Sequence, residues 1–90
     1  VSDDVETSIN LNIYPNPSSG IFNISFISEK LNSFRITITD TYGKIIFNDK
    51  SIDFIGEYTR RIDLSKYSKG IYMIRVRTNN KLVDERIILH

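Results

Sequence analysis

Few side chains of this 90-residue chain are suited to covalent or acid–base chemistry. His90 is the single histidine and the last residue, and the sequence contains no cysteine. A serine–histidine–aspartate relay would depend on a frayed terminal residue, and no thiolate nucleophile, thiolate zinc site or disulfide can form. We therefore expect no enzymatic activity, no catalytic residue and no cofactor.

The acidic residues show no spacing typical of a site. Asp3/Asp4 and Asp84/Glu85 are sequence neighbours, and neighbours on a strand point to opposite faces, so we interpret them as solvated surface charges. Four more aspartates lie in or near expected loops, without the D-x-D-x-D-G pattern of a calcium loop. We predict no metal site and keep calcium binding as an alternative at these four: Asp40, Asp49, Asp53 and Asp63.

The net charge of +1 is unevenly distributed, because residues 1–57 carry −4 and residues 58–90 carry +5. A basic final third suits an anionic glycolipid, a nucleic acid or an acidic partner, but Lys and Arg also protect exposed sheet edges, and we favour that second interpretation. No helix or aromatic stacking motif accompanies the charge, so we expect no nucleic-acid binding. No apolar run approaches the roughly 20 residues of a membrane-spanning helix, so we expect a chain that does not itself span a membrane.

Short runs in which apolar and polar residues alternate dominate the pattern. A period of two is typical of half-buried β-strands, and turn residues separate the runs. The runs are 9–13, 21–27, 34–39, 45–47, a weak one at 52–55, 57–64, 71–77 and 82–89. We predict an all-β fold, an antiparallel immunoglobulin-like β-sandwich of about seven strands, formed by residues 9–90 after a flexible acidic linker, residues 1–8.

The phase of the alternation predicts which side chains face the core. Arg75 and Arg77 are expected to face outwards from their strand. The expected core includes Phe22, Ile24, Phe26, Tyr58, Ile62, Leu64, Tyr72, Ile74 and Val76.

The turns carry proline, glycine and asparagine. Pro15 and Pro17 remove two backbone donors and favour an extended Asn16, while Gly20 can adopt the positive φ of a closing turn. Gly43, between Asp40 and Lys44, can likewise adopt a positive φ, which predicts a turn and a β-hairpin there.

The last two runs pose a conflict of register. A two-residue loop at Asn79-Asn80 would pair Arg75 with Asp84 favourably, but it would also set Glu85 opposite Ile74 on the core face. We therefore expect a bulge or a longer loop near Asn80 or Asp84 to shift the register before Ile87.

Five motifs in a fixed order resemble a known family. They are Tyr14-Pro-Asn-Pro-Ser-Ser-Gly20, Ile36 to Lys44, Ile62 to Ser65, Gly70 to Val76 and the basic-apolar ending Arg86 to Leu89. Over about residues 9–90 they resemble the type A C-terminal sorting domain of the type IX secretion system, also called the Por secretion system. The terminal Lys or Arg common in that family is replaced by His90.

The resemblance implies a secretion signal. Such a domain directs a larger cargo protein across the outer membrane of a Gram-negative bacterium of the Bacteroidetes type, after a separate N-terminal signal has led the cargo across the inner membrane. The implied partners are the type IX translocon, outer-membrane shuttle proteins and a sortase-like protease, which removes the domain and joins the cargo to anionic lipopolysaccharide. The implied location of the product is the cell surface or the medium.

The resemblance also implies two sets of site residues. For the recognition set we further expect the last strand to add to a partner sheet, with the hairpin Gly70 to His90 facing the translocon. Partner recognition is expected at Tyr14, Pro15, Asn16, Pro17, Gly20, Gly43, Lys44, Gly70, Ile71, Tyr72, Arg75, Arg86, Ile87, Ile88 and Leu89. Cleavage is expected at Val1, Ser2, Asp3, Asp4, Val5, Glu6, Thr7 and Ser8, or before them.

Two other interpretations stay open. A carbohydrate-binding module would carry exposed aromatic residues, for which Tyr42, Tyr58 and Tyr67 are the candidates. A fibronectin type III-like spacer of a secreted enzyme would show neither glycan affinity nor a role in export. An apolar strand that ends the sequence favours the sorting domain over the spacer.

Overall fold

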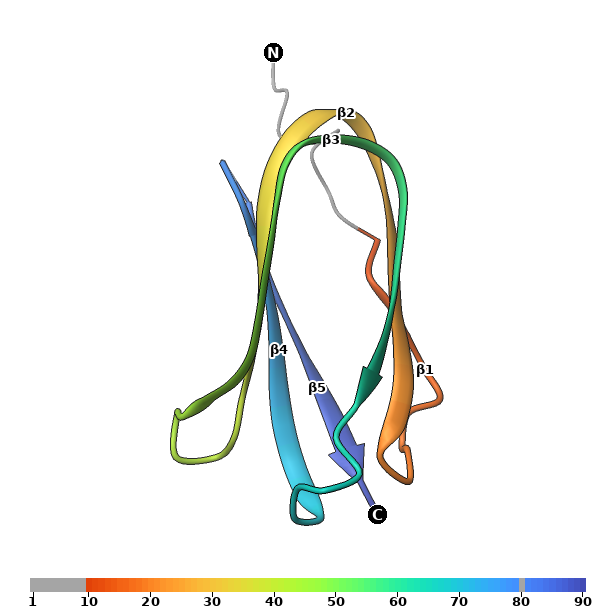
Figure 1. The fold of residues 1–90 in the computed structure, drawn as a ribbon, viewed down its shortest axis with the longest axis vertical. Coiled ribbons are helices and arrows are strands. Elements are labelled where there is room, and N and C mark those ends of the chain that lie inside the picture. Colours follow the sequence, from red (N-terminus) through yellow and green to blue (C-terminus); the bar gives the residue numbers. More distant parts are fainter. Residues whose placement is uncertain (1–9, 80) are drawn as a thin grey trace.

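The computed structural model describes residues 10–79 and 81–90, which form one curled antiparallel sheet (Figure 1). Its strands are β1 (Asn12–Tyr14), β2 (Ile21–Thr39), β3 (Ile45–Asp63), β4 (Gly70–Thr78) and β5 (Leu82–Leu89). They are ordered β1-β2-β4-β5, and β3 also pairs with β2. The prediction of an antiparallel all-β fold is confirmed. The described residues contain no helix long and apolar enough to cross a membrane.

β2 and β3 are each 19 residues long and arch together over one end of the molecule (Figure 1). Their register shifts between Ser28 and Asn32 and again before Phe34, and Asp53 and Gly56 take positive φ values of 56° and 111°. Such irregularities bend a sheet because they increase its local twist. The first half of β2 therefore pairs with β1 and the second half with β4, so that the sheet folds back on itself as a half-barrel.

The predicted immunoglobulin-like sandwich of seven separate strands is not what the structure shows. The runs 21–27 and 34–39 belong to the single strand β2, and the runs 45–47, 52–55 and 57–64 belong to β3 apart from Leu64, which follows it. Gly56, which separates the runs 52–55 and 57–64, lies at the bend of a continuous strand, opposite Ser28. The run 9–13 corresponds to β1 at 12–14, and the linker at 1–8 lies outside the described residues.

The core lies on the inner face of the curl. All nine side chains expected to face it are buried, and five more complete it: Phe34, Ile36, Ile38, Ile87 and Leu89. Under the arch, Phe26, Phe34, Phe54 and Tyr58 form an aromatic cluster with ring centroids 4.9 to 5.9 Å apart. Ring pairs of this kind contribute about 0.5–1.5 kcal/mol beyond their burial.

Side chains of β3 join the two limbs of the curl. Asp49, in the first half of β3, accepts hydrogen bonds from the Tyr58 hydroxyl (2.8 Å) and from Arg60 Nη1 (2.7 Å), both in the second half. The Arg60 guanidinium also lies 5.3 Å from the centroid of the Phe47 ring. Burial, together with the hydrogen bond to the Asp49 carboxylate, raises the pKa of Tyr58 to about 12.

β4 and β5 pair without interruption from Arg77↔Leu82 to Gly70↔Leu89, so the expected bulge was wrong; Asn80 itself lies outside the described residues. The pair that the unshifted register implied is present: Arg75 Nε donates to Asp84 Oδ1 at 2.8 Å, and this bond lowers the pKa of the Asp84 carboxyl. Glu85 does lie opposite Ile74. It is nevertheless exposed, since β5 is the last strand of the sheet order and its inner face is open there.

Candidate recognition surface

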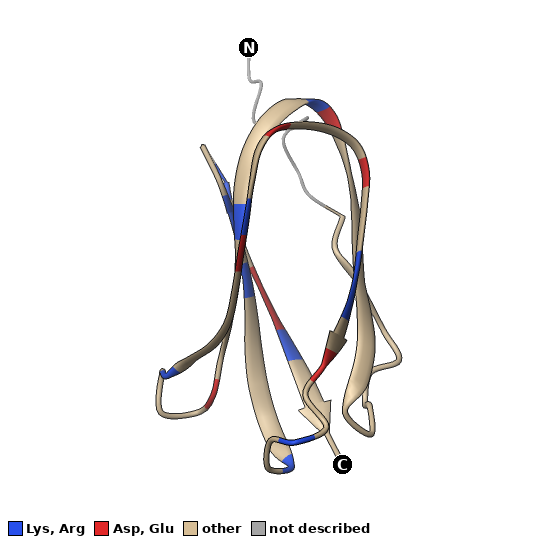
Figure 2. Cartoon of the chain, viewed as in Figure 1, with Lys and Arg blue, Asp and Glu red and all other residues tan. Residues whose placement is uncertain are grey.

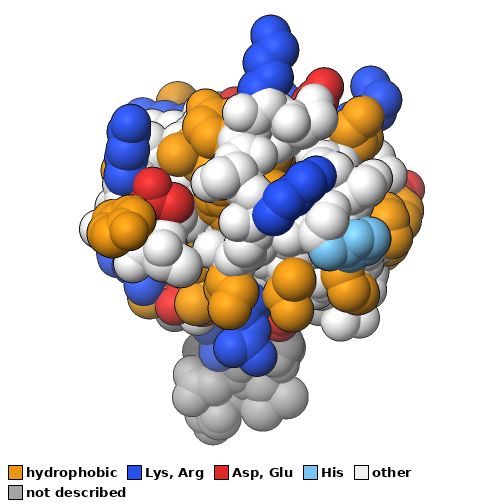
Figure 3. All heavy atoms as spheres, turned by 90° about the horizontal axis from the view of Figure 1, so that it is seen from below, with side chains coloured by type: hydrophobic (Ala, Val, Ile, Leu, Met, Phe, Trp, Pro, Cys, Tyr) orange, Lys and Arg blue, Asp and Glu red, His pale blue; other side chains and the backbone are white. Residues whose placement is uncertain are grey.

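The end of the molecule opposite the arch brings together segments that are far apart in the sequence (Figure 1). Because the strands alternate in direction, the connections after β1, β2 and β3 and the end of β5 all arrive there. We call residues 15–20, 40–44, 64–70 and 86–90 the motif end, since each of the five sequence motifs contributes to it. Figure 3 shows this end with hydrophobic, basic and histidine side chains mixed on its surface.

Asn16 connects the first motif to the last. Its Nδ2 donates to the carbonyl of Arg86 (3.0 Å), and its Oδ1 accepts from the backbone N–H of Ile88 (3.2 Å). A side-chain amide offers the same donor and acceptor as a peptide group, so Asn16 pairs with β5 much as a neighbouring strand would. The Tyr14–Pro15 and Asn16–Pro17 peptide bonds are both cis.

Ser18 extends this pairing with its backbone. Its N–H donates to the carbonyl of Ile88 and its carbonyl accepts from the N–H of His90, both at 2.9 Å, in a parallel bridge. The side chain is 1% exposed; its Oγ donates to the carbonyl of Ile21 and accepts from the N–H of Gly20. Ser18 was not among the individual recognition residues expected from the sequence, although a serine two residues before a turn glycine is a signal for such side-chain-to-backbone bonding.

These contacts occupy the outer edge of β5. The last strand was expected to offer a free edge for strand addition, but Asn16 and Ser18 already pair with residues 86–90. Paired edges protect a sheet from unwanted association. A partner that adds a strand at residues 86–90 would first have to displace segment 16–18.

Gly20 holds the first motif against the third. Its carbonyl accepts from the N–H of Leu64 (2.7 Å), and a Cβ at Gly20 would lie 2.9 Å from the Cα of Ser65. Its φ of +137° also disfavours any other residue. The Asp63 carboxylate shapes the facing turn, because it accepts from the Ser65 hydroxyl (2.6 Å) and N–H (2.9 Å), which lowers the pKa of Asp63.

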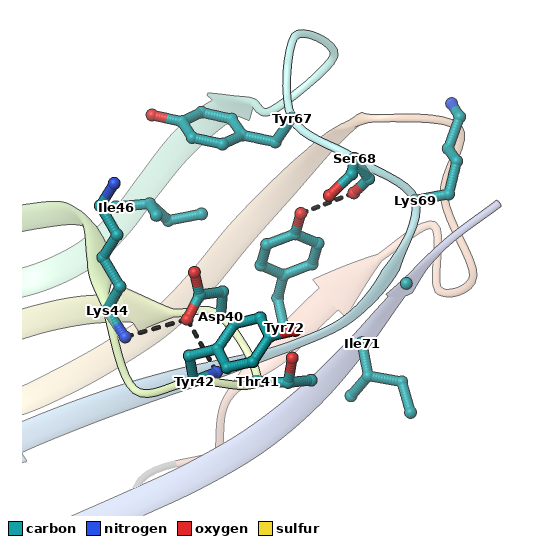
Figure 4. A pocket seen from close by; sticks show the side chains of 11 residues that line it. Asp40, Thr41, Tyr42, Lys44, Ile46, Tyr67, Ser68, Lys69, Ile71 and Tyr72 are labelled. Carbon is teal, nitrogen blue, oxygen red and sulfur yellow. Dashed lines mark hydrogen bonds between the residues drawn. The ribbon is translucent and has the colours of Figure 1, made fainter.

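A pocket of about 210 Å³ opens beside the second and fourth motifs (Figure 4). Tyr42, 94% exposed, and Tyr67, 43% exposed, line it together with Lys44. Asp40 Oδ1 fixes the predicted hairpin by accepting from the N–H groups of Tyr42 and Lys44, both at 2.9 Å. Gly43, at φ +85°, completes this turn as the sequence predicted.

The structure sorts the expected recognition residues into three groups. Exposed at or beside the motif end are Tyr14, Pro15, Asn16, Pro17, Gly43, Lys44, Ile71, Arg86 and Ile88. Ile87, Leu89, Tyr72 and Gly20 are buried and Gly70 is half-buried, so these support the surface from within. Arg75 lies in the middle of β4, paired with Asp84. The expected cleavage segment, Val1 to Ser8, lies outside the described residues.

Three of the four aspartates considered for calcium binding accept hydrogen bonds from protein groups. Asp40 and Asp63 bond to turn N–H groups, and Asp49 bonds to Tyr58 and Arg60. Within residues 10–79 and 81–90 no group of three acidic or histidine side chains is placed to hold a metal ion.

Comparison with known proteins identifies one family. The family model described as secretion system C-terminal sorting domain matches residues 12–90 and so includes all five motifs. No curated protein matches the chain.

Proposed function

Since this chain belongs to the family of Por secretion system C-terminal sorting domains, we propose that residues 9–90 are the export address of a larger secreted protein. The family membership implies a role as a secretion signal that leads across the outer membrane of a Gram-negative bacterium. In the full proposal, the type IX translocon and its shuttle proteins bind the domain. A sortase-like protease then cuts within or before Val1 to Ser8, and the cargo is joined to anionic lipopolysaccharide.

The surface that we propose the secretion machinery recognises is the folded motif end. No linear segment of the sequence is proposed to be sufficient for recognition by itself. The observation that carries this proposal is the bridge from Asn16 to Arg86 and Ile88. It places the first and last motifs of the family on one surface although about 70 residues separate them. A receptor that needs both motifs therefore needs the domain to be folded.

An outward apolar pair gives this surface a contact that a receptor can bury. Ile71 of β4 lies opposite Ile88 of β5, and the two side chains are 44% and 41% exposed. Cross-strand aliphatic pairs that face outwards are available to a partner, and burying an aliphatic side chain is worth about 1.5–3 kcal/mol. Arg86 flanks the pair, opposite Met73, and adds positive charge.

The test uses residues 1–90 fused to a reporter with an N-terminal export signal, in a bacterium with a working type IX system. The double variant Ile71→Ser/Ile88→Ser removes the outward pair without touching the core. We expect it to fold, as judged by circular dichroism, and to lose most surface delivery. The matched control, Ile52→Ser/Ile55→Ser, changes two exposed isoleucines of β3 at the arch and should be delivered like the parent. Equal delivery of both variants would overturn the proposal for this surface.

A second function, glycan binding, is favoured by one observation. Tyr42 and Tyr67 line the same pocket, which also contains Lys44, Lys69 and Asp40, and sugar rings commonly stack on exposed aromatic side chains next to polar groups. Tyr58, the third candidate, is 8% exposed and belongs to the aromatic cluster. Calorimetric titration with soluble glycans, repeated with Tyr42→Ala, tests this function. A spacer of the fibronectin type III kind predicts no heat of binding and no effect on export.

A further inference from the structure

Three basic residues form a row across the outer face of the sheet, on three neighbouring strands. Lys50 of β3 lies opposite Arg35 of β2, and Arg35 lies opposite Arg77 of β4. Residues directly opposite on antiparallel strands project from the same face, with Cβ atoms about 4.5–5.5 Å apart. The neighbouring Ile36 and Val76 are fully buried, so the three cations, which we call the basic row, face solvent.

The basic row lacks acidic partners within the described part of the chain. The two ion pairs found there are Arg60–Asp49 and Arg75–Asp84, and neither involves the row. Arg35 donates to a neutral group, the Asn48 Oδ1, at 3.2 Å. Figure 2 shows the basic positions on β2 and β4 as blue segments.

The arrangement is unfavourable for the free domain. Like charges directly opposite each other destabilise a pair of strands. The contrast with Arg75 is informative, because that residue lies two positions before Arg77 on the same face of β4 and has Asp84 opposite it. A ligand with negative charge would relieve the repulsion between Arg35 and Arg77.

We propose that the basic row binds a phosphate or sulfate ester group. Arg35 and Arg77 supply neighbouring guanidinium groups, whose planar N–H donors match tetrahedral oxyanions, and Lys50 adds a third charge. Strands are about 4.8 Å apart, so the row extends over roughly 10 Å and suits a ligand with several such groups. This site is separate from the motif end, and its role does not depend on export.

The test measures binding at about 0.15 M salt, where weak charge contacts are screened. One arm titrates the domain with dextran sulfate and with neutral dextran; the other uses phosphatidylcholine vesicles with and without an anionic phospholipid. Arg35→Gln/Arg77→Gln is compared with Arg61→Gln/Lys66→Gln, which removes the same charge from exposed positions elsewhere.

We expect the Arg35/Arg77 double variant to weaken anion binding at least about tenfold, and the control variant to change it less than about twofold. We also expect the anionic ligand to raise the melting temperature of the parent domain and not that of the Arg35/Arg77 variant. Without ligand, that variant should be at least as stable as the parent. Binding in one arm alone identifies the source of the ester as polysaccharide or lipid. Equal weakening by both variants, or no binding in either arm, overturns the proposal.

Discussion

The backbone N–H of Ile88 donates a hydrogen bond to the side chain of Asn16, 72 residues earlier in the chain. With the bond from Asn16 to Arg86 and the backbone pairing of Ser18, it closes the edge of the last strand. The proline-bounded segment therefore acts as a short substitute strand. This makes the two ends of the domain one structural unit and links the stability of β5 to the first motif.

Replacing Asn16 by alanine is expected to lower the free energy of unfolding by about 1–2 kcal/mol, because two hydrogen bonds are lost. Amide exchange at Ile88 should become faster, since its N–H loses its acceptor. Asn16→Asp keeps an acceptor and should affect Ile88 less. The control Asn12→Ala, at an exposed position of β1, should leave the amide exchange rate of Ile88 unchanged. An unchanged rate in Asn16→Ala would contradict the hydrogen bond between Ile88 and Asn16.

Gly20→Ala is expected to be among the most damaging single substitutions, since it combines a positive φ with a 2.9 Å approach to the Ser65 backbone. The left-handed strain alone costs about 1–3 kcal/mol, and the contact adds to it. Gly43→Ala carries strain without a contact, because no atom lies within 4 Å of its Cβ position. Gly20→Ala should therefore have a lower melting temperature than Gly43→Ala. The reverse order would show that the close approach to Ser65 does not determine the loss of stability.

The raised pKa of Tyr58 predicts a loss of stability in alkali. A folded-state pKa of about 12, against about 10 for an unfolded tyrosine, gives stability that is fully present below pH 10 and is lost as the pH rises towards 12. Ultraviolet titration should show one tyrosine that ionises last, together with unfolding. Tyr58→Phe should remove this late step and Tyr42→Phe should retain it; a late step that survives in Tyr58→Phe would assign it to another residue.

The pair between Arg75 and Asp84 predicts a modest loss of stability in acid. The pKa of Asp84 is lowered by the hydrogen bond from Arg75, so the contribution is present above an unfolded value of about 3.9 and is lost as the pH falls through the lower folded value. Because the pair is exposed, a double-mutant cycle of Arg75→Gln and Asp84→Asn should give less than about 1 kcal/mol at neutral pH. If the coupling free energy between Arg75 and Asp84 stayed the same at a pH where Asp84 is protonated, the interaction between them would not be ionic.

The sequence by itself determined the features that depend only on residues close together in the chain. Alternation with a period of two placed Phe22, Ile24 and Phe26 on the core face, because side-chain direction along a strand does not depend on the partner strand. The hairpin at Gly43 was equally local, since its turn needs a positive φ at that position. The outward direction of Arg75 followed from the same alternation, whereas its register opposite Asp84 was the alternative that the sequence had disfavoured.

Only the tertiary structure decided the long-range relationships. The polar residues near Asn32 look like a break between two strands, but one strand continues there around a bend, because Ser28 and Asn32 both still pair with β3 on either side of a register shift. Glu85 opposite Ile74 was expected to force a bulge, and it did not, since an edge strand leaves the carboxylate in water. The contact of Asn16 with Ile88 has no local signature, because it exists only when the folded sheet brings the two ends of the domain together.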